Sequence, residues 1–310
     1  MKGRVLITGA SGFIGTRLCL ALAKDGWPIR GAARDPSLVT GAGVEPAAMP
    51  DLSQGADWAR LLDGVTHVVH LAGLAHAPGT LPYAAYTRIN AEAVGEFAAA
   101  AHGQVERFVF MSSVRAQAGL SAHLPINEQD TPAPTDSYGR AKLEAERLLA
   151  QSGVPFTVLR PAVVYGKGVK GNIAALATLA RTAMPLPFGG LTNRRSLLAL
   201  DNLASAVALV LEAEAARTET FLVADKEPIA VADLVAAMRE GLGRSPHLVK
   251  MPLGGVRRLL KTVGREADWE RIAGDFVVDV SKLMGIGWRP AVTTHDGIVR
   301  MMRAENGSAR

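Results

Sequence analysis

Three glycines spaced three residues apart follow the first apolar run of this chain, and they constrain its fold more than any other feature. Arg4–Thr8 (RVLIT) reads as a buried strand, and Gly9, Gly12 and Gly15 open a helical pattern that extends over 13–25. In a strand–turn–helix unit, such glycines permit a tight turn, close approach of a pyrophosphate, and close helix–strand packing. The pattern therefore predicts a dinucleotide site at the N-terminus of the first helix.

Short β-branched runs alternate with helical patterns through the first half of the chain. Further strands are expected at 28–33, 67–71, 107–111 and 157–160, and helices at 55–62, 83–101 and 137–151. This alternation implies parallel βαβ units with right-handed crossovers and helices on both faces. We therefore expect an α/β fold: a Rossmann-type doubly wound parallel sheet with a smaller, mostly helical C-terminal substrate lobe.

The strand–helix alternation of the sequence ends near residue 165. Gly/Pro-rich segments then separate helical stretches, the last of them expected at Val256–Val263, and Phe221–Ala224 reads as one late strand. We expect residues 1–165 to form the NAD(P)-binding domain, rejoined by a strand near 220–224. Residues 166–310 then form the substrate-binding lobe.

Composition excludes several classes of protein. The single cysteine, Cys19, rules out an internal disulfide framework and a Cys-rich zinc site, and it fits a reducing compartment. The seven histidines form no metal-binding motif, so no metal is expected. The net charge of +5 comes from basic residues that are scattered along the sequence. They form no run of positive charge of the kind that indicates nucleic-acid binding. Apolar runs are too short for a membrane span and no signal peptide is visible, so we expect a cytoplasmic protein.

Tyr138 and Lys142 lie four residues apart in a predicted helix and therefore share one face. A positioned phenol can exchange a proton with a substrate hydroxyl, although its ordinary pKa of about 10 makes it a poor base. A neighbouring ammonium and a positive nicotinamide ring would favour the phenolate. Alone, the pair would more often be a surface tyrosine and lysine. The glycine turn and Ser113, just past the strand at 107–111, favour the catalytic interpretation.

Taken in order, these motifs resemble the extended branch of the short-chain dehydrogenase/reductase superfamily, the NAD-dependent epimerase/dehydratase family. The likeness is closest to bacterial UDP-N-acetylhexosamine 4-epimerases and 4-keto reductases, and it runs nearly from end to end of the chain. The motifs that carry it are Thr8–Gly15, His70–Gly73, Arg88–Ala91, Ser112-Ser113, the Tyr138/Lys142 pair, Leu159–Gly166 and Asn193–Leu203.

The resemblance implies a site for each partner of the reaction. It gives catalytic roles to Ser113, Tyr138 and Lys142, with Tyr138 as proton donor or acceptor. The expected cofactor site consists of Gly9, Ser11, Gly12, Phe13, Ile14, Gly15, Arg34, Asp51, Leu52, Leu71, Ala72, Gly73, Asn90, Tyr138, Lys142 and Pro161. The expected substrate site consists of Ser113, Tyr165, Arg194 and Arg195.

The end of the second expected strand bears on which dinucleotide binds. A carboxylate there would bind the ribose 2′-hydroxyl of NAD, whereas an arginine accommodates the 2′-phosphate of NADP. Arg34 takes that position and Asp35 follows one place later. NADP(H) is therefore favoured over NAD(H), with NAD as the alternative.

Two adjacent arginines stand in the half assigned to the substrate. The planar guanidinium forms bidentate bonds with phosphate oxygens, so an arginine here suits a sugar-nucleotide diphosphate. Spacing favours Arg194, with Arg195 next, and Asp201 is expected to N-cap the following helix.

These expectations point to an NAD(P)-dependent oxidoreductase acting at C4 of a nucleotide sugar, a UDP-hexose or UDP-N-acetylhexosamine. It would be a 4-keto reductase or a 4-epimerase, and Arg34 favours the reductase. One alternative is an NADPH-dependent reductase of a non-sugar carbonyl such as a dihydroflavonol or sterol, against which the arginine stretch argues. Another is a non-catalytic NADP(H)-binding sensor or assembly factor, against which the Tyr138/Lys142 pair argues. A homodimer is expected by analogy alone.

Overall fold

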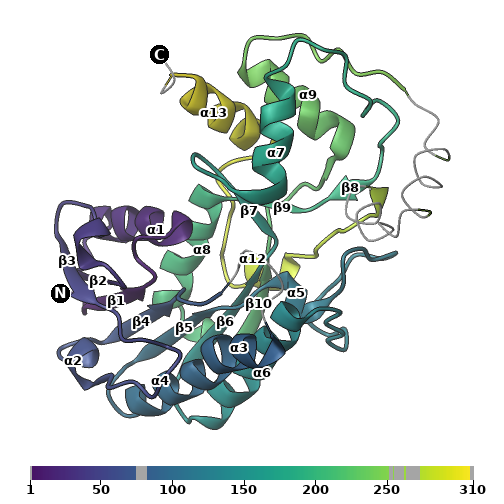
Figure 1. Ribbon diagram of the computed structural model, residues 1–310. Coiled ribbons are helices and arrows are strands. Elements are labelled where there is room, and N and C mark those ends of the chain that lie inside the picture. Colours follow the sequence, from purple (N-terminus) through teal and green to yellow (C-terminus); the bar gives the residue numbers. More distant parts are fainter. Residues whose placement is uncertain (1, 75–81, 251–253, 255–261, 263–272, 308–310) are drawn as a thin grey trace.

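A seven-stranded parallel sheet occupies the centre of the computed structural model, which describes residues 2–74, 82–250, 254, 262 and 273–307. The strand order is β10-β6-β5-β4-β1-β2-β3 (Figure 1). The strands are β1 (Val5–Thr8), β2 (Ile29–Ala33), β3 (Val44–Ala48), β4 (His67–His70), β5 (Arg107–Met111), β6 (Phe156–Pro161) and β10 (Glu219–Val223). The chain changes direction across the sheet between β1 and β4, and such a switch point is where open α/β sheets bind ligands.

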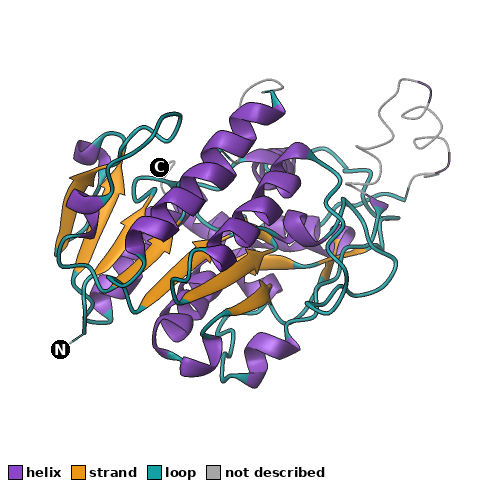
Figure 2. Cartoon of the chain, turned by 90° about the horizontal axis from the view of Figure 1, so that it is seen from below, coloured by secondary structure: helices purple, strands orange, loops and turns teal. Residues whose placement is uncertain are grey.

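Helices cover both faces of this sheet, as the view along it in Figure 2 shows. Alternate residues of β1 point to opposite faces: Val5 and Ile7 pack with α1 (Phe13–Lys24) and α8 (Leu200–Glu212). Leu6 packs with α2 (Ala59–Leu62), α4 (Ala93–Ala101) and α6 (Ser137–Gln151) on the other face. The helices are α1 (Phe13–Lys24), α2 (Ala59–Leu62), α3 (Tyr83–Thr87), α4 (Ala93–Ala101), α5 (Val114–Gln117), α6 (Ser137–Gln151), α7 (Gly171–Ala180), α8 (Leu200–Glu212), α9 (Val231–Gly241), α12 (Ser281–Gly285) and α13 (Thr294–Gly307). The expected doubly wound α/β architecture is thereby confirmed.

A second, smaller core forms the lobe, which lies above the sheet in Figure 1. Helices α7, α9 and α13 pack there with short strands. These strands are β7 (Val163–Tyr165) with β9 (Leu197–Ala199), and β8 (Arg194–Arg195) with β11 (Ile229–Ala230). Two later elements return to the sheet: α8 packs on α1, and β10 pairs with β6. The lobe and the unit built on the seven-stranded sheet therefore interleave along the chain.

Local departures from the expected elements have physical causes. Strand β3 went unrecognised because Pro46 and exposed positions mask its pattern, as an edge strand allows. The single helix expected over 83–101 is interrupted by a π-helical turn at Arg88–Glu92. The N-cap expected at Asp201 is wrong, since α8 already begins at Leu200 and Asp201 pairs instead with Arg17 at 2.7 Å. The helix expected at 256–263 lies outside the described residues apart from position 262.

Within the described ranges, no helix is both long enough and apolar enough to cross a bilayer.

Candidate active site

The glycine turn has room for a ligand because side chains are excluded from it. Gly9 has a φ of +69°, a conformation that favours glycine. A Cβ on Gly12 would lie 3.1 Å from the Gly9 carbonyl oxygen, and one on Gly15 would lie 2.2 Å from the same atom. No side chain caps the N-terminus of α1, and its first turn contains no acidic residue. The N–H groups and the positive dipole end of this helix are therefore available to an anion. These residues fit a dinucleotide pyrophosphate.

The residues expected around that turn are distributed as follows. Ser11 is exposed at the turn, and Phe13 and Ile14 begin α1. Leu71 and Ala72 follow β4, and their N–H groups donate to Thr8 Oγ1 at 3.1 and 3.2 Å. Asp51 is exposed after β3 with Leu52 beside it, and Pro161 ends β6.

Asn90 lies on the π-helical turn and is fully buried. Its Nδ2 donates to the Leu74 carbonyl at 2.9 Å, and its Oδ1 accepts the Leu74 N–H at 2.7 Å. A Cβ on Gly73 would lie 2.7 Å from Asn90 Oδ1 and 3.9 Å from Lys142 Nζ. Asn90 thus holds the segment after β4 close to the predicted lysine, and π-turns of this kind are frequent at functional sites.

Ser113, Tyr138 and Lys142 converge at the carboxyl end of β5. Lys142 Nζ donates to the Met111 carbonyl at 2.8 Å and lies 4.6 Å above the Phe110 ring. The same Nζ lies 6.0 Å from the Tyr138 ring centre. A hydrogen bond joins the Tyr138 phenol to the Ser113 side chain. A hydroxyl, a phenol and an ammonium therefore meet beside the switch point of the sheet.

Burial dominates the proton affinities of this group. It raises the pKa of Tyr138 to about 12, against the opposing hydrogen bond from Ser113. It lowers the pKa of Lys142 to about 8, against the opposing charge of Glu146. The expected shift of Tyr138 toward the phenolate includes the positive charge of a bound nicotinamide ring, and it stays a prediction. At neutral pH the phenol is protonated and the lysine is mostly charged.

Sequence reasoning missed the ion pair that joins the two catalytic segments. Arg115, two residues after Ser113, donates from Nε to Asp136 at 3.0 Å. Asp136 is also the N-cap of α6 and accepts the Gly139 N–H at 2.6 Å. An aspartate before a helical pattern is an N-cap signal, so this residue could have been found. Its pairing with Arg115 could not, because the two belong to different elements.

Arg34 stands directly after β2, exposed, and its side chain forms no hydrogen bond or ion pair with the described part of the chain. The carboxylate of Asp35 is already engaged, because Oδ1 accepts the Ser37 N–H at 3.0 Å and the Ser37 hydroxyl at 2.6 Å. Asp35 Oδ2 accepts no hydrogen bond from the described residues, so both side chains at this strand end can still reach a ligand.

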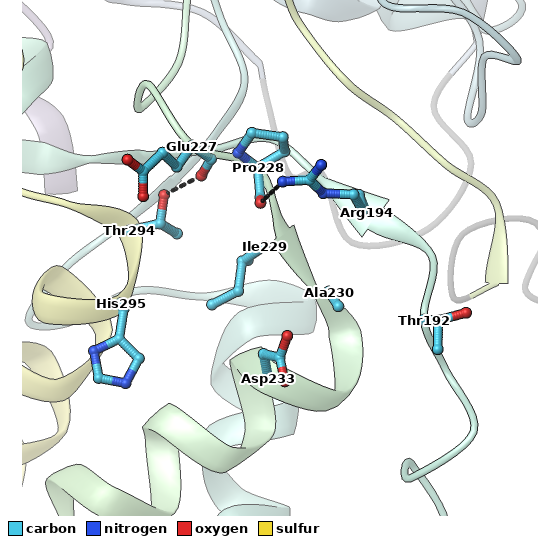
Figure 3. A pocket seen from close by; sticks show the side chains of 9 residues that line it. All are labelled: Thr192, Arg194, Glu227, Pro228, Ile229, Ala230, Asp233, Thr294 and His295. Carbon is cyan, nitrogen blue, oxygen red and sulfur yellow. Dashed lines mark hydrogen bonds between the residues drawn. The ribbon is translucent and has the colours of Figure 1, made fainter.

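The two adjacent arginines point in different directions. Arg194 is exposed, donates to the Pro228 carbonyl at 3.1 Å, and lines a pocket of about 450 Å³ that contains none of the predicted catalytic residues (Figure 3). Arg195 is partly buried and donates to the carbonyls of Leu120 at 3.2 Å and Gly274 at 3.0 Å. Leu120 follows α5 and hence Ser113, so Arg195 faces the catalytic segment.

The electrostatics of Arg195 agree with that placement. Its pKa is lowered to about 10, first by burial and then by the positive charge of Arg115. Arg115 belongs to the segment that starts at Ser113. Two guanidinium groups therefore stand near each other on the side of Ser113, whereas Arg194 turns away. This geometry brings Arg195, and not the Arg194 that spacing favours, toward the segment that starts at Ser113.

Tyr165 does not fit the substrate role expected of it. Its side chain is 1% exposed in the lobe core, where the hydroxyl donates to Asp225 Oδ2 at 2.9 Å. The same hydroxyl lies 3.2 Å from the Thr294 carbonyl. Burial, followed by the charge of Asp225, raises the pKa of this phenol. The contacts of Tyr165 tie β7 to the segment after β10 and to the first residue of α13.

Among the described residues, no group of three or more His, Cys, Asp or Glu side chains could hold a metal ion.

Comparison with known proteins indicates the same family as the glycine turn and the Tyr138/Lys142 pair. The profile of the NAD dependent epimerase/dehydratase family matches residues 5–224. A UDP-glucose 4-epimerase of Vibrio cholerae is 30% identical over 98% of this chain and 96% of its own length. The N-acetyl-alpha-D-glucosaminyl-diphospho-ditrans,octacis-undecaprenol 4-epimerase of Escherichia coli O157:H7 is 30% identical over 82% of this chain and 77% of its own.

A similar fold occurs in the UDP-glucuronic acid 4-epimerase of Bacillus cereus, solved in complex with UDP-glucuronic acid and NAD. It superposes with a TM-score of 0.77 at 20% identity, over 99% of this chain and 100% of that one. The fold, the end-to-end similarity and the Tyr138/Lys142 site lead to one conclusion. The chain belongs to the NAD dependent epimerase/dehydratase family, the enzymes of the extended short-chain dehydrogenase/reductase type that its motifs indicate.

Proposed function

We propose that this chain oxidises and re-reduces C4 of a UDP-linked hexose and so acts as a nucleotide-sugar 4-epimerase. The observation that carries the proposal is the convergence of Ser113, Tyr138 and Lys142 at the end of β5, beside the side-chain-free turn of Gly9 to Gly15. The UDP-glucose 4-epimerase of Vibrio cholerae supports the choice of reaction, because its similarity extends over nearly the whole of both chains.

The glycine turn and the N-terminus of α1 would hold the pyrophosphate of a nicotinamide dinucleotide. When bound, that group supplies a hydride acceptor or donor next to the substrate carbon. The segment Leu71–Gly73, held close by Asn90, would line the same edge. Lys142 presents its ammonium between this segment and the Met111 carbonyl.

Tyr138 is the proton-transfer group in this proposal. In the reducing direction its phenol, protonated at neutral pH, donates a proton to the C4 oxygen. In the oxidising direction it must first become the phenolate, which nearby positive charge favours. Ser113, bonded to the phenol in the free protein, would share the C4 oxygen with it.

Arg195 is proposed to bind the substrate diphosphate. Its guanidinium is partly buried, stands 5.3 Å from the Phe276 ring centre, and is anchored on two carbonyls. Preorganised arginines of this kind lose little conformational entropy on binding an anion. The exposed Arg194, which reaches toward Pro228, is not part of the proposed site.

A second candidate function is favoured by Arg34. Its exposed guanidinium, directly after β2, suits the 2′-phosphate of NADP(H), and an exchanging NADPH suits net reduction of a 4-keto sugar. We therefore retain the NADPH-dependent 4-keto reductase as the alternative outcome of the same machinery.

One experiment separates the two. Purified protein is denatured and the released dinucleotide identified, and the folded protein is assayed with UDP-glucose, UDP-N-acetylglucosamine and UDP-glucuronic acid for C4 epimers by NMR. Retained NAD together with epimer formation supports the epimerase. Absence of epimers, combined with NADPH consumption on a UDP-4-keto sugar that Arg34→Ala weakens about tenfold, supports the reductase. Turnover of none of these sugars would refute the proposal.

A further inference from the structure

A buried polar network lies directly behind the catalytic lysine. Glu146, one turn after Lys142 on α6, accepts hydrogen bonds from Arg160 Nε at 3.0 Å and Arg160 Nη2 at 2.5 Å. It also accepts a hydrogen bond from the Ser112 hydroxyl. Ser112, Glu146 and Arg160 are 3%, 8% and 5% exposed, so all three polar groups are removed from water.

The network joins the strands and helices that carry the active site. Ser112 lies between Met111, the partner of Lys142 Nζ, and Ser113. Arg160 precedes the last residue of β6 and also donates to Gln117 of α5. Gln117 in turn donates to the Asp130 carbonyl at 2.7 Å. The carboxylate of Glu146 is thus fixed against β5, β6 and α5 at once.

Burial of these charges needs an explanation beyond stability. A buried ion pair is often no more stabilising than apolar residues of the same size, because desolvation offsets the attraction. Perturbed charged networks beside a reactive group are more frequent at functional sites. Here the group within reach is Lys142, four residues earlier on the same face of α6.

Lys142 is poorly placed to stay charged on its own. Its Nζ lies over the Phe110 ring and is 3.9 Å from the position of a Cβ on Gly73, with the Met111 carbonyl as its hydrogen-bond partner. Burial pulls the pKa of this lysine down, and the charge of Glu146 is the opposing influence. Loss of that charge would bring the lysine close to deprotonation at neutral pH.

We propose that Glu146 is a positioning residue of the active site: its carboxylate, fixed by Ser112 and Arg160, keeps Lys142 in the ammonium form. The consequence for catalysis rests on the proposed function, since Tyr138 needs a neighbouring positive charge to act as a base.

Other charged groups that face Lys142 from neighbouring elements do not replace this carboxylate. His70 of β4 is buried and neutral, because burial lowers its pKa to about 3. On the elements packed against α6, three further charged side chains are already paired: Arg160 of β6 with Glu146, Arg115 of α5 with Asp136, and Glu96 of α4 with Arg88. Within the described residues, Glu146 is the acid whose charge supports Lys142.

The test is a titration of the Lys142 side chain in the full-length protein, labelled with lysine carrying ¹³C at Cε and free of substrate and cofactor. The Lys142 signal is assigned by its disappearance in Lys142→Arg. The wild-type midpoint is expected near pH 8. In Glu146→Gln, which keeps the size of the side chain but removes its charge and replaces one acceptor oxygen with an amide donor, the midpoint is expected about 1 pH unit lower.

Glu144→Gln is the matched control. It lies two residues earlier on α6 and pairs with Arg147 at the surface, so its removal should leave the midpoint unchanged. Because no sugar is present, a wrong substrate assignment cannot disturb this measurement. An unchanged midpoint in a folded Glu146→Gln overturns the proposal, whatever that variant does to stability.

Two milder variants decide the question if Glu146→Gln does not fold. Glu146→Asp keeps the charge but withdraws it from the lysine, so a smaller fall in the midpoint is expected. Ser112→Ala removes one donor from the carboxylate, which leaves more of its charge to act on Lys142, so the midpoint should rise. No movement in either variant, or a fall in Ser112→Ala, refutes the role.

Discussion

Thr8 Oγ1 and His70 Nδ1 lie 2.9 Å apart at the ends of two adjacent parallel strands, β1 and β4. The threonine hydroxyl already accepts the N–H groups of Leu71 and Ala72. Its own proton is therefore the one shared with His70, which must be the neutral imidazole with its proton on Nε2. These three hydrogen bonds fix the backbone that follows β4, where the dinucleotide is proposed to bind.

The hydrogen bond between Thr8 and neutral His70 predicts that the folded protein loses stability in mild acid. The folded-state pKa of His70 is about 3, below its ordinary value of 6.5, so between these values the unfolded chain binds a proton that the folded chain does not. Its contribution is complete above pH 6.5 and declines as the pH falls, by about 2 kcal/mol at pH 5. Urea unfolding of His70→Asn should show a shallower decline than wild type. Equal slopes in the two proteins would contradict this account, since the other histidines are common to both.

Substitution of Tyr138 and of Tyr165 should affect different properties, kcat in the first case and the free energy of unfolding in the second. Tyr138→Phe is expected to lower kcat by about 10²- to 10⁴-fold while dinucleotide binding persists, because only proton transfer is lost. Tyr165→Phe should keep kcat near wild type but lower the free energy of unfolding by about 1–3 kcal/mol, because Asp225 loses a buried donor. Steady-state kinetics and urea unfolding of both variants check the contrast. A Tyr165→Phe protein with normal stability and a large loss of kcat would reverse our assignment.

Arg194 and Arg195 form a natural matched pair. Arg195→Met should weaken UDP binding by about 10- to 100-fold, the effect of losing a charge-assisted hydrogen bond. Arg194→Met should leave UDP affinity within about twofold, because that side chain is an exposed group outside the proposed site. Calorimetric titration with UDP measures both, and circular dichroism verifies that each variant is folded. Greater sensitivity at Arg194 would restore the order that spacing suggested.

The geometry of the glycine turn predicts that an added methyl group disrupts it at Gly15, whereas the same change is tolerated at Gly285. In Gly15→Ala the new Cβ would stand 2.2 Å from the Gly9 carbonyl oxygen, so the turn must open and dinucleotide affinity should fall by at least about 100-fold. Gly285→Ala meets nothing within 4 Å inside α12 and should be neutral or up to about 1 kcal/mol more stable. Fluorescence titration with NADH and with NADPH compares them. Retained affinity in Gly15→Ala would show that the turn is not the pyrophosphate site.

What could be predicted from the sequence was set mainly by local geometry. The roles of Gly9 and Gly15 depend on a strand, a turn and a helix that are contiguous in the chain, so spacing alone identifies them. Tyr138 and Lys142 share a face because they belong to one helix. The pKa values of these two groups depend on burial by distant segments, which the spacing of Tyr138 and Lys142 along the chain does not reveal.

Two kinds of feature could not be predicted from the sequence. One depends on which of two successive strand residues faces a given side, and the other is a contact between segments that are distant in the chain. Successive residues of a strand face opposite sides, so within β8 one position decides whether Arg194 or Arg195 faces the segment that follows Ser113. Tyr165 was expected to contact substrate, but its partner Asp225 lies 60 residues later. The Glu146–Arg160 pair likewise joins a helix to the following strand. Spacing along the chain contains no signal for such contacts.

The return of β10 to the edge of the sheet determines how the protein can emerge from the ribosome. Strand β6 has no outer neighbour until β10 has been synthesised, and α8 must also arrive before its face of the sheet is covered. A nascent chain that ends between α7 and α8 therefore exposes an open strand edge and an uncovered apolar face, the surfaces that promote aggregation and recruit chaperones. A fragment ending at Tyr165 would share this defect, and the nucleotide-binding unit completes its folding only when much of the lobe has already been made.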